Sequence, residues 1–306
     1  SACIFENGTL IAAAEEERFT RIKHTTTFPY MSINFCLNKL DLDISKIDVI
    51  TVNSNPFASF FDKAIFLIKN PESLPIAFNS LNNSSKKYNL KNYIAKIDKD
   101  KIFSGKIKFI DHHESHMASS LFFNNFKECV NLSIDGFGDF SSCAWGFSMN
   151  KNLKIDKKVY FPHSLGIFYQ AMTQYLGFKN YGDEYKVMGL SSYGKPKYAD
   201  LISKLIYKKK EGFELNLNYF VHHKKQILST NKNAQAVYKD LYSNRLIALL
   251  GDEREKDENL TIKHMDLAKS IQTVYEDIFF HILNNLHKKY KNDNLSLSGG
   301  CAMNSV

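Results

Sequence analysis

Three predicted strands between residues 130 and 160 are followed by helices and then by one more short strand. Val130–Ile134, Cys143–Phe147 and Lys154–Tyr160 have the length and residue types of strands in a meander. A long helix is expected over 262–287, where apolar side chains recur at three- and four-residue spacing, and a strand over Leu295–Leu297 follows it. This order of elements, with strands first, then helices and then a strand that ends in Gly-Gly, predicts a layered α/β fold.

The first third of the chain is expected to mix a hairpin with helices and strands. Residues 2–14 are predicted to form the hairpin, because Asn7-Gly8 is a strong turn signal between two apolar segments. The other expected elements are, in chain order, a helix over 30–40, a strand over 49–52, helices over 57–100 with a polar break near 79–85, a strand over 107–110, a helix from residue 117, helices over 164–176 and 184–192, and a polar insertion over 200–230. A length of 306 residues suits about two domains.

Charge and cysteine content narrow the class of protein. The net charge is +8, but nearly all of the positive charge is dispersed lysine, which is not typical of a nucleic-acid surface. We therefore do not expect nucleic acid as a partner, although the charge could attract anionic ligands. The five cysteines are odd in number and form no C-x-x-C pair, which indicates reduced thiols and a cytoplasmic protein. No apolar run approaches the ~20 residues of a membrane span, so no membrane is expected.

The most specific chemical pattern is the pair His112 and His116. A spacing of four places both imidazoles on one side of a helix, one turn apart, which suits two ligands of one divalent metal. Asp135, at the end of a predicted strand, is the expected third ligand. Imidazole and carboxylate together fit iron(II), zinc or manganese. The alternative is that the two histidines cap or pack a helix and bind nothing.

A similarity to zinc peptidases is only superficial. His113-Glu114-Ser115-His116 is one residue shorter than the H-E-x-x-H motif of those enzymes. The missing residue rotates the second histidine by about 100° around the helix from its place in that motif. The segment therefore does not predict a peptidase.

Two glycine-containing segments allow a functional and a structural interpretation. Asp135–Asp139 could bring backbone amides to a phosphate or hold a cation, or it could be a plain hairpin turn. Ser298–Asn304 follows a strand, so its Gly-Gly could present amides to an anion or nucleotide, or simply turn the chain.

Two charged segments are equally open. Glu184 and Lys186, within Tyr181–Leu190, could contact a polar ligand or could begin a solvated helix. Arginine and lysine in Glu15–His24 could clamp a phosphate or an acyl-adenylate, or the segment could be an exposed charged loop.

Taken together, these segments resemble the O-carbamoyltransferase family, the enzymes of nodulation-factor and antibiotic tailoring. No one segment would suffice, and the match rests on their order and spacing across almost the whole chain. The matching runs are EEERFTRIKH over 15–24, HHESHMASS over 112–120, DGFGD over 135–139, EYKVMGL over 184–190 and GGCAMN over 299–304.

The resemblance implies a fold of duplicated ribonuclease-H-like domains, of the actin/hexokinase (ASKHA) type. This fold is similar to that of the subunit that makes threonylcarbamoyl-adenosine in tRNA. Residues 1–125 would form the first subdomain and 126–306 an incomplete second one. The family's first strand, with its His-Asp-Ser-Ser-Ala motif, and its C-terminal adenylating domain have no counterpart between Ser1 and Val306. We therefore expect a fragment that lacks both ends and is inactive alone.

The resemblance also implies a reaction. Carbamoyl phosphate and ATP, with magnesium, would give carbamoyl-adenylate, and the carbamoyl group would pass to a hydroxyl of a sugar or a glycosylated small molecule. The implied residues are His112, His116 and Asp135 as ligands of a metal, with iron(II) favoured; His116 and Lys186 as catalytic residues; Asp139, Gly299, Gly300 and Asn304 at the nucleotide; and Arg21 and Lys23 at the substrate.

Other functions stay open at this stage. The chain could be a catalytically silent ASKHA module that binds a nucleotide or a partner protein, or a relative of the tRNA-modifying enzyme. A homodimer also stays open. Neither the acceptor nor the general base can be named from the sequence.

Overall fold

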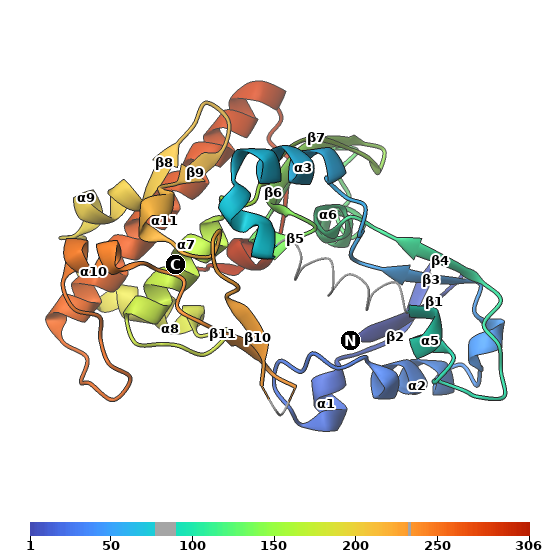
Figure 1. Cartoon of the computed structure of the whole chain (residues 1–306). Coiled ribbons are helices and arrows are strands. Elements are labelled where there is room, and N and C mark those ends of the chain that lie inside the picture. The colour runs from blue at the N-terminus through green and yellow to red at the C-terminus, as the bar shows by residue number, and fades with distance from the viewer. Residues whose placement is uncertain (77–89, 232–233) are drawn as a thin grey trace. The chain divides into compact units, whose positions relative to one another are not determined.

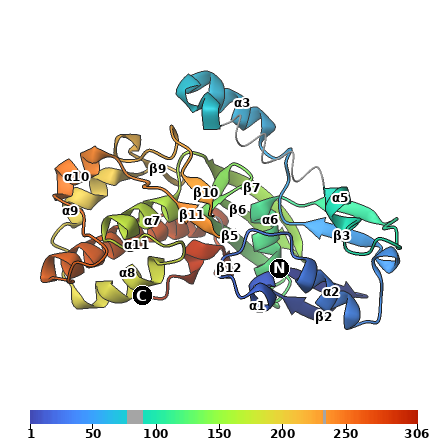
Figure 2. The same cartoon turned by 60° about the horizontal axis from the view of Figure 1, so that its bottom comes forward.

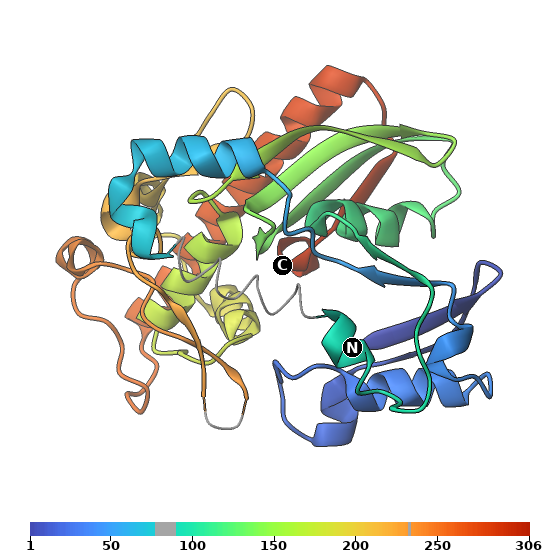
Figure 3. The same ribbon diagram turned by 45° about the vertical axis from the view of Figure 1, so that its right-hand side comes forward.

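The meander predicted between residues 130 and 160 forms the centre of a four-stranded sheet in the computed structural model, which describes residues 1–76, 90–231 and 234–306 (Figure 1). Three antiparallel strands run in chain order, and Figure 3 shows them in green; they are β5 (Glu128–Gly138), β6 (Ser141–Met149) and β7 (Asn152–Tyr160). The fourth strand, β12 (Leu295–Ser298), pairs in parallel with β5.

Three helices lie side by side next to this sheet (Figure 2): α7 (Leu165–Tyr175), α8 (Glu184–Leu190) and α11 (Ile262–Tyr290). The apolar spacing predicted for 262–287 is that of α11, whose Ile271 and Ile278 are buried in the main hydrophobic core. The core is therefore built between the sheet and this helical layer.

Strand β5 divides its side chains between two faces of the sheet, because successive residues of a strand point in opposite directions. Leu132 and Ile134 are fully buried in the core with α7 and α11. Ser133 and Asp135 belong to the other set, and both contact side chains of α6 (His112–Leu121), which packs on β5 and β12. The pleat thus places Asp135 on the face that carries the two predicted histidine ligands.

The chain forms two compact units whose segments interleave. The first comprises residues 1–52, 75–109 and 228–239, and the second comprises 53–74, 110–227 and 240–306. The prediction has a single boundary at 125/126, whereas here the chain passes between the units several times. The assignment of 1–125 and 126–306 to two duplicated ASKHA subdomains stays a prediction.

The described part of the first unit contains three two-stranded sheets and several short helices, with Leu37, Ile44 and Ile94 in a small buried cluster. The predicted hairpin over 2–14 is confirmed, with Asn7 and Gly8 at positive φ in its turn. The elements of this unit are β1 (Ala2–Glu6), β2 (Thr9–Ala14), α1 (Glu16–Thr20), α2 (Tyr30–Asn38), the 3-10 turn η1 (Ile44–Lys46), β3 (Val49–Val52), α5 (Leu90–Ile94), β4 (Lys106–Phe109), which pairs in parallel with β3, and the hairpin of β10 (Leu228–Thr230) and β11 (Ala236–Tyr238).

The second unit contains several shorter elements besides the sheet and its helices. They are α3 (Phe60–Lys69), η2 (Pro71–Ser73), η3 (Ser191–Tyr193), α9 (Ala199–Ile202), η4 (Ser203–Leu205), β8 (Ile206–Lys208), β9 (Phe213–Leu215), η5 (Leu217–Tyr219), α10 (Asn244–Leu250) and η6 (Gly300–Met303). The segment 200–230 was expected to be a polar insertion. Ile202, Phe213 and Phe220 are instead buried in the main core, so this segment is not peripheral to it.

The mixed α/β class is confirmed, and most element positions agree with the sequence-based expectations. Two of the differences affect the site: α6 begins at His112 and not near residue 117, and β5 continues beyond Ile134 to Gly138. The predicted polar break near 79–85 lies outside the described residues. Among the helices in the described ranges, none combines the length and the apolar character needed to cross a bilayer.

Candidate metal centre

Helix α6 begins at His112 because Asp111 caps it. The Asp111 carboxylate accepts hydrogen bonds from the amides of His113 at 3.0 Å and Glu114 at 3.3 Å. Its second oxygen lies 2.6 Å from the Lys158 ammonium, a residue of β7. Burial alone would raise the pKa of Asp111, but this ammonium outweighs burial and lowers it. The cap is therefore anionic and fixes the start of the helix against the sheet.

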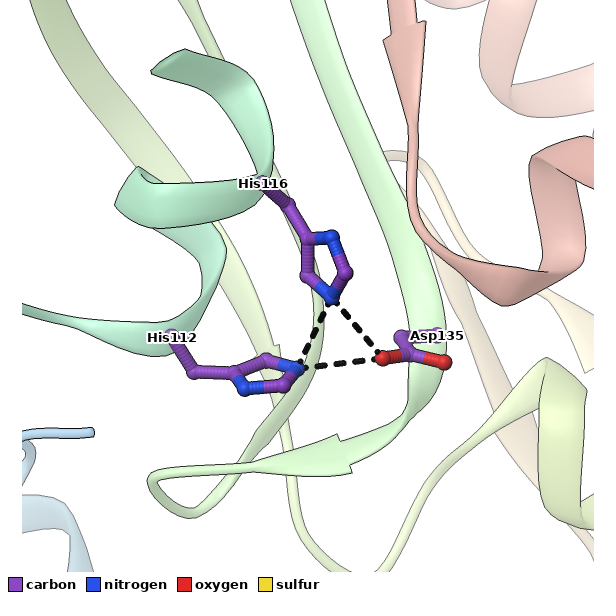
Figure 4. Close-up of side chains that lie close together, drawn as sticks. All are labelled: His112, His116 and Asp135. Carbon is purple, nitrogen blue, oxygen red and sulfur yellow. Dashed lines mark hydrogen bonds and ion pairs between the residues drawn. The ribbon is translucent and has the colours of Figure 1, made fainter. Parts of the chain in front are cut away.

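Because α6 begins there, His112 and His116 lie one turn apart and point to the same place (Figure 4). Their Nε2 atoms are 3.1 Å from each other, and they lie 3.0 Å and 3.1 Å from Oδ2 of Asp135. The three side chains are between 20% and 32% exposed, so the cluster is partly buried and open on one side. The predicted ligand set thus meets at one point.

The two oxygens of Asp135 have separate partners. Oδ1 accepts from the backbone amide of Gly136 at 2.8 Å and from that of Gly300 at 3.3 Å, which leaves Oδ2 for the imidazoles. Burial raises the pKa of Asp135, but the hydrogen bonds from His112 and His116 outweigh burial and hold the pKa far below its usual range. The carboxylate is therefore ionised, as a metal ligand must be.

The arrangement of the two Nε2 atoms and Oδ2 suits a bound cation better than hydrogen bonds among these three atoms. If both Nε2 atoms carried protons toward Oδ2, two N–H groups would face each other across 3.1 Å and repel. Three lone pairs directed at one cation remove this conflict. His112, His116 and Asp135 would therefore be able to hold one divalent ion between them.

The His112 ring is held in place by the β5–β6 turn. A Cβ atom on Gly138 would lie 2.0 Å from Cγ of His112, so the ring occupies the space of the missing side chain. The His112 amide donates to the Asp139 carboxylate at 3.0 Å, which also accepts from the Ser54 hydroxyl and the Asn55 amide, each at 2.6 Å. Asp139, predicted at the nucleotide, thus ties this turn to α6.

His113 points away from the cluster into the protein. It is fully buried, and its Nδ1 lies 2.8 Å from the Ser133 hydroxyl. Burial lowers the pKa of His113 to about 4, so the ring is neutral at pH 7. This histidine anchors α6 to β5 and is not part of the ligand set.

The Gly-Gly turn after β12 lies directly beside Asp135. Gly299 has a φ of +90°, and a Cβ there would be 2.2 Å from the Ile134 carbonyl oxygen, so only glycine fits. Asn304, also predicted at the nucleotide, forms two reciprocal 3.0 Å hydrogen bonds with the side-chain amide of Gln272. The nucleotide-binding role of this turn stays a prediction.

The remaining predicted residues have their partners elsewhere among the described residues. Lys186 forms an ion pair with Asp183 at 2.7 Å at the start of α8. Arg21 and Lys23 belong to the first compact unit, where the Arg21 amide donates to the Glu17 carbonyl at 3.0 Å. Their roles at the substrate stay predictions.

Sequence reasoning missed several residues that support the cluster. Lys158 gave no local signal, because its partner Asp111 lies 47 positions away. Ser164 could have been found, since a serine directly before an apolar helix is a typical N-cap. Its hydroxyl accepts a hydrogen bond from the Ile167 amide and donates one to the Gly136 carbonyl at 2.7 Å. Ser164 therefore joins the start of α7 to the residue next to Asp135.

Comparison with known proteins gives one consistent result. A protein of Synechocystis named sll1178 is 34% identical to the whole of this chain, which covers 49% of that protein. The nodulation protein NolNO of Sinorhizobium fredii is 30% identical over 99% of this chain, which covers 40% of NolNO. The protein MJ1051 of Methanocaldococcus jannaschii is 28% identical over 99% of the chain and 49% of its own length. The chain thus spans about half, or less, of the curated relatives it matches.

The family model described as carbamoyltransferase N-terminus matches residues 1–306, the full length of the sequence. This agrees with the order of the five segments noted above and with the match to a nodulation protein. The chain therefore belongs to the carbamoyltransferase family and corresponds to its N-terminal part.

Proposed function

We propose that this chain carries the metal-dependent transfer site of an enzyme that moves a carbamoyl group onto a hydroxyl of a sugar or glycosylated small molecule. The observation that carries the proposal is the convergence of His112, His116 and Asp135 on one point. Membership of the carbamoyltransferase family supports carbamoyl transfer as the reaction. The donor is proposed to be carbamoyl-adenylate, formed from carbamoyl phosphate, water and ATP with magnesium, with release of phosphate and pyrophosphate. Attack of the acceptor hydroxyl on the carbamoyl carbon then releases AMP and the hydroxyl proton.

The chemistry explains why such a site is needed. A carbamoyl carbon is a poor electrophile, because the nitrogen donates electron density into it, and a sugar hydroxyl is a poor nucleophile. A divalent ion at the three ligands would polarise the carbamoyl oxygen and lower the pKa of a nearby hydroxyl. We favour iron(II), since a set of two imidazoles and one carboxylate is typical of that ion; manganese and zinc are the alternatives.

The chain's own residues hold this site in a defined shape. The amides of Gly136 and Gly300 fix the unused oxygen of Asp135, so the carboxylate presents Oδ2 alone. Gly138 and Asp139 set the position of the His112 ring. Ligands fixed in this way need little rearrangement when the ion or the substrate binds, which favours catalysis.

The nucleotide and substrate contacts complete the proposal. The turn at Gly299 and Gly300 lies beside Asp135, which supports placing the adenylate there. Asn304 and Asp139 would border it, Lys186 would assist the transfer, and Arg21 and Lys23 would contact the substrate. These assignments rest on the family resemblance.

Metal content tests the site directly. Freshly isolated full-length enzyme is expected to contain close to one equivalent of iron, measured by plasma mass spectrometry, and His116→Ala is expected to lose it. Glu114→Gln, an exposed neighbour on the same helix, is the matched control and should keep the metal. Folded wild-type protein without bound metal would contradict the proposal and favour a silent module that binds only a nucleotide or a partner.

Activity provides the second test. In the full-length enzyme, His116→Ala is expected to abolish carbamoyl transfer and to leave adenylate formation, followed as ATP–pyrophosphate exchange, measurable. Loss of both reactions in a folded protein would show that the two steps do not use separate sites.

A further inference from the structure

We propose that a cavity beside α3 binds the ring of a neutral sugar and so forms the acceptor subsite of this enzyme; this inference rests on the proposed function. The cavity is widely open to solvent, has a volume of about 300 Å³ and lies wholly within the second compact unit. That volume is at the lower end of small-molecule sites and suits one sugar ring.

Aromatic rings form much of the cavity wall. Phe66 of α3 lies 5.7 Å from the ring of Phe140 and 5.1 Å from that of Phe161, both edge to face. Tyr160, the last residue of β7, also lines the cavity. The C–H groups on one face of a sugar are apolar and slightly positive, so they pack well on the negative face of such rings.

Polar groups at the same wall can bind hydroxyls. Asp62 and Lys69 both line the cavity, and burial together with Asp62 raises the pKa of the Tyr160 hydroxyl, which places the carboxylate near that phenol. His163 accepts the Leu215 amide on Nδ1 at 3.1 Å, so the proton of its neutral ring is on Nε2, available as a donor. An apolar wall with a few polar groups is the pattern of a selective small-ligand site.

The charge of the cavity favours a neutral ligand over a nucleotide. The formal charges of Asp62 and Lys69 cancel. Lys69 and Asn70 are at the C-terminal end of α3, where the helix dipole is negative. The Lys69 ammonium would attract a phosphate, but the Asp62 carboxylate and this dipole would oppose it, whereas an uncharged sugar needs no net charge at the site.

The backbone connects this cavity to the metal centre. Gly138 lies against the His112 ring, Asp139 accepts the His112 amide, and Phe140, the next residue, lines the cavity. Asp139 and Phe140 both have positive φ, at 49° and 74°, which is uncommon for a phenylalanine. Positive φ at both positions is the geometry of a two-residue hairpin turn between β5 and β6, in which Gly138 pairs with Ser141. The turn thus joins the acceptor wall to the ligands that would activate the transferred group.

Binding of simple glycosides tests the subsite. Saturation-transfer NMR on the full-length enzyme, with methyl β-glucoside, methyl α-mannoside and the methyl glycoside of N-acetylglucosamine as probes, is expected to show binding of at least one. Phe66→Ala, Asp62→Asn and the cavity-filling Leu217→Trp should each weaken that binding at least tenfold. Phe61→Ala, which truncates a 79% exposed ring of the same helix, is the matched control and should leave binding unchanged.

Several results would overturn the subsite. One is the absence of a signal from any glycoside with folded protein, and another is equal weakening of binding in the Phe61 and Phe66 variants. A third is displacement of the glycoside by AMP, which would indicate a nucleotide subsite. Iron content measured on the same samples separates the two proposals. Bound iron without glycoside binding refutes the subsite alone. Glycoside binding that Phe66→Ala abolishes, in a protein without any bound metal, refutes the proposed function alone.

Discussion

At the scale of single residues, the candidate ligands were readable from the sequence but their supports were not. The spacing of His112 and His116 alone predicts that their side chains lie together, because a helix brings residues four apart to one side. Asp135 could be named because a strand ends near it. The partners of Asp139 could not be named, because Ser54 and His112 approach it across 85 and 27 positions of sequence. Contacts between residues so far apart in the chain leave no periodic pattern in the sequence.

Gly138 offers the sharpest test at this scale. Gly138→Ala is expected to displace the His112 ring, since the added Cβ would lie 2.0 Å from the ring, and to weaken metal binding between tenfold and about a hundredfold. Gly136→Ala is the matched control, because a Cβ there meets no atom within 4 Å. A metal titration followed by calorimetry measures both. Equal affinity in the two variants would show that the ring position does not matter.

At the scale of elements, strand and helix cores were predicted more reliably than their ends. The start of α6 at His112 depends on the cap at Asp111, and that cap depends on Lys158 from β7. The apolar pattern of the helix begins later, which is why its start was expected near residue 117. The continuation of β5 to Gly138 follows from pairing with β6, which propensity alone does not show.

The cap of α6 leads to a prediction for stability. Asp111→Ala removes two capping hydrogen bonds and leaves Lys158 without its carboxylate, so the free energy of unfolding should fall by roughly 2 kcal/mol. Metal affinity should fall with it, because α6 holds two ligands. Asp43→Ala, which removes the cap of η1 in the first unit, should reduce stability and leave metal affinity unchanged. Urea unfolding and metal titration separate the two effects.

At the scale of the whole molecule, the order of elements predicted the mixed α/β class, but not the interleaving of the two units. Segment 228–239 belongs to the first unit although its flanking sequence belongs to the second. The local composition does not show where the chain passes from one unit back to the other. The hydrophobic residues of 200–230 were likewise obscured by their polar neighbours, although several are buried.

Burial of histidine should make the stability of the whole fold depend on pH. His222 is 2% exposed and donates its Nε2 proton to the Pro162 carbonyl at 2.7 Å, and burial lowers its pKa to about 4. The unfolded chain takes up a proton near pH 6.5 that the folded chain refuses until about pH 4. The free energy of unfolding should therefore fall as the pH falls through this window, by on the order of 3 kcal/mol from this residue.

Urea unfolding at pH 7 and pH 4.5 checks this prediction. His222→Gln should show a smaller decrease between the two pH values than the wild type. His287→Gln, whose side chain is 62% exposed in the native protein, should show the full decrease. An equal decrease in all three proteins would place the acid sensitivity elsewhere.

The parallel pairing of β12 with β5 has a consequence for how the protein is made. Gly300, whose amide holds Oδ1 of Asp135, lies 165 residues after it. During synthesis both histidines and Asp135 leave the ribosome long before Gly300 exists, so any ion captured by the nascent chain meets a carboxylate held by the Gly136 amide alone. In the proposed metal site, β12 and the turn after it therefore add the second amide that holds Asp135, so the carboxylate is fully fixed only after this part of the polypeptide has been made.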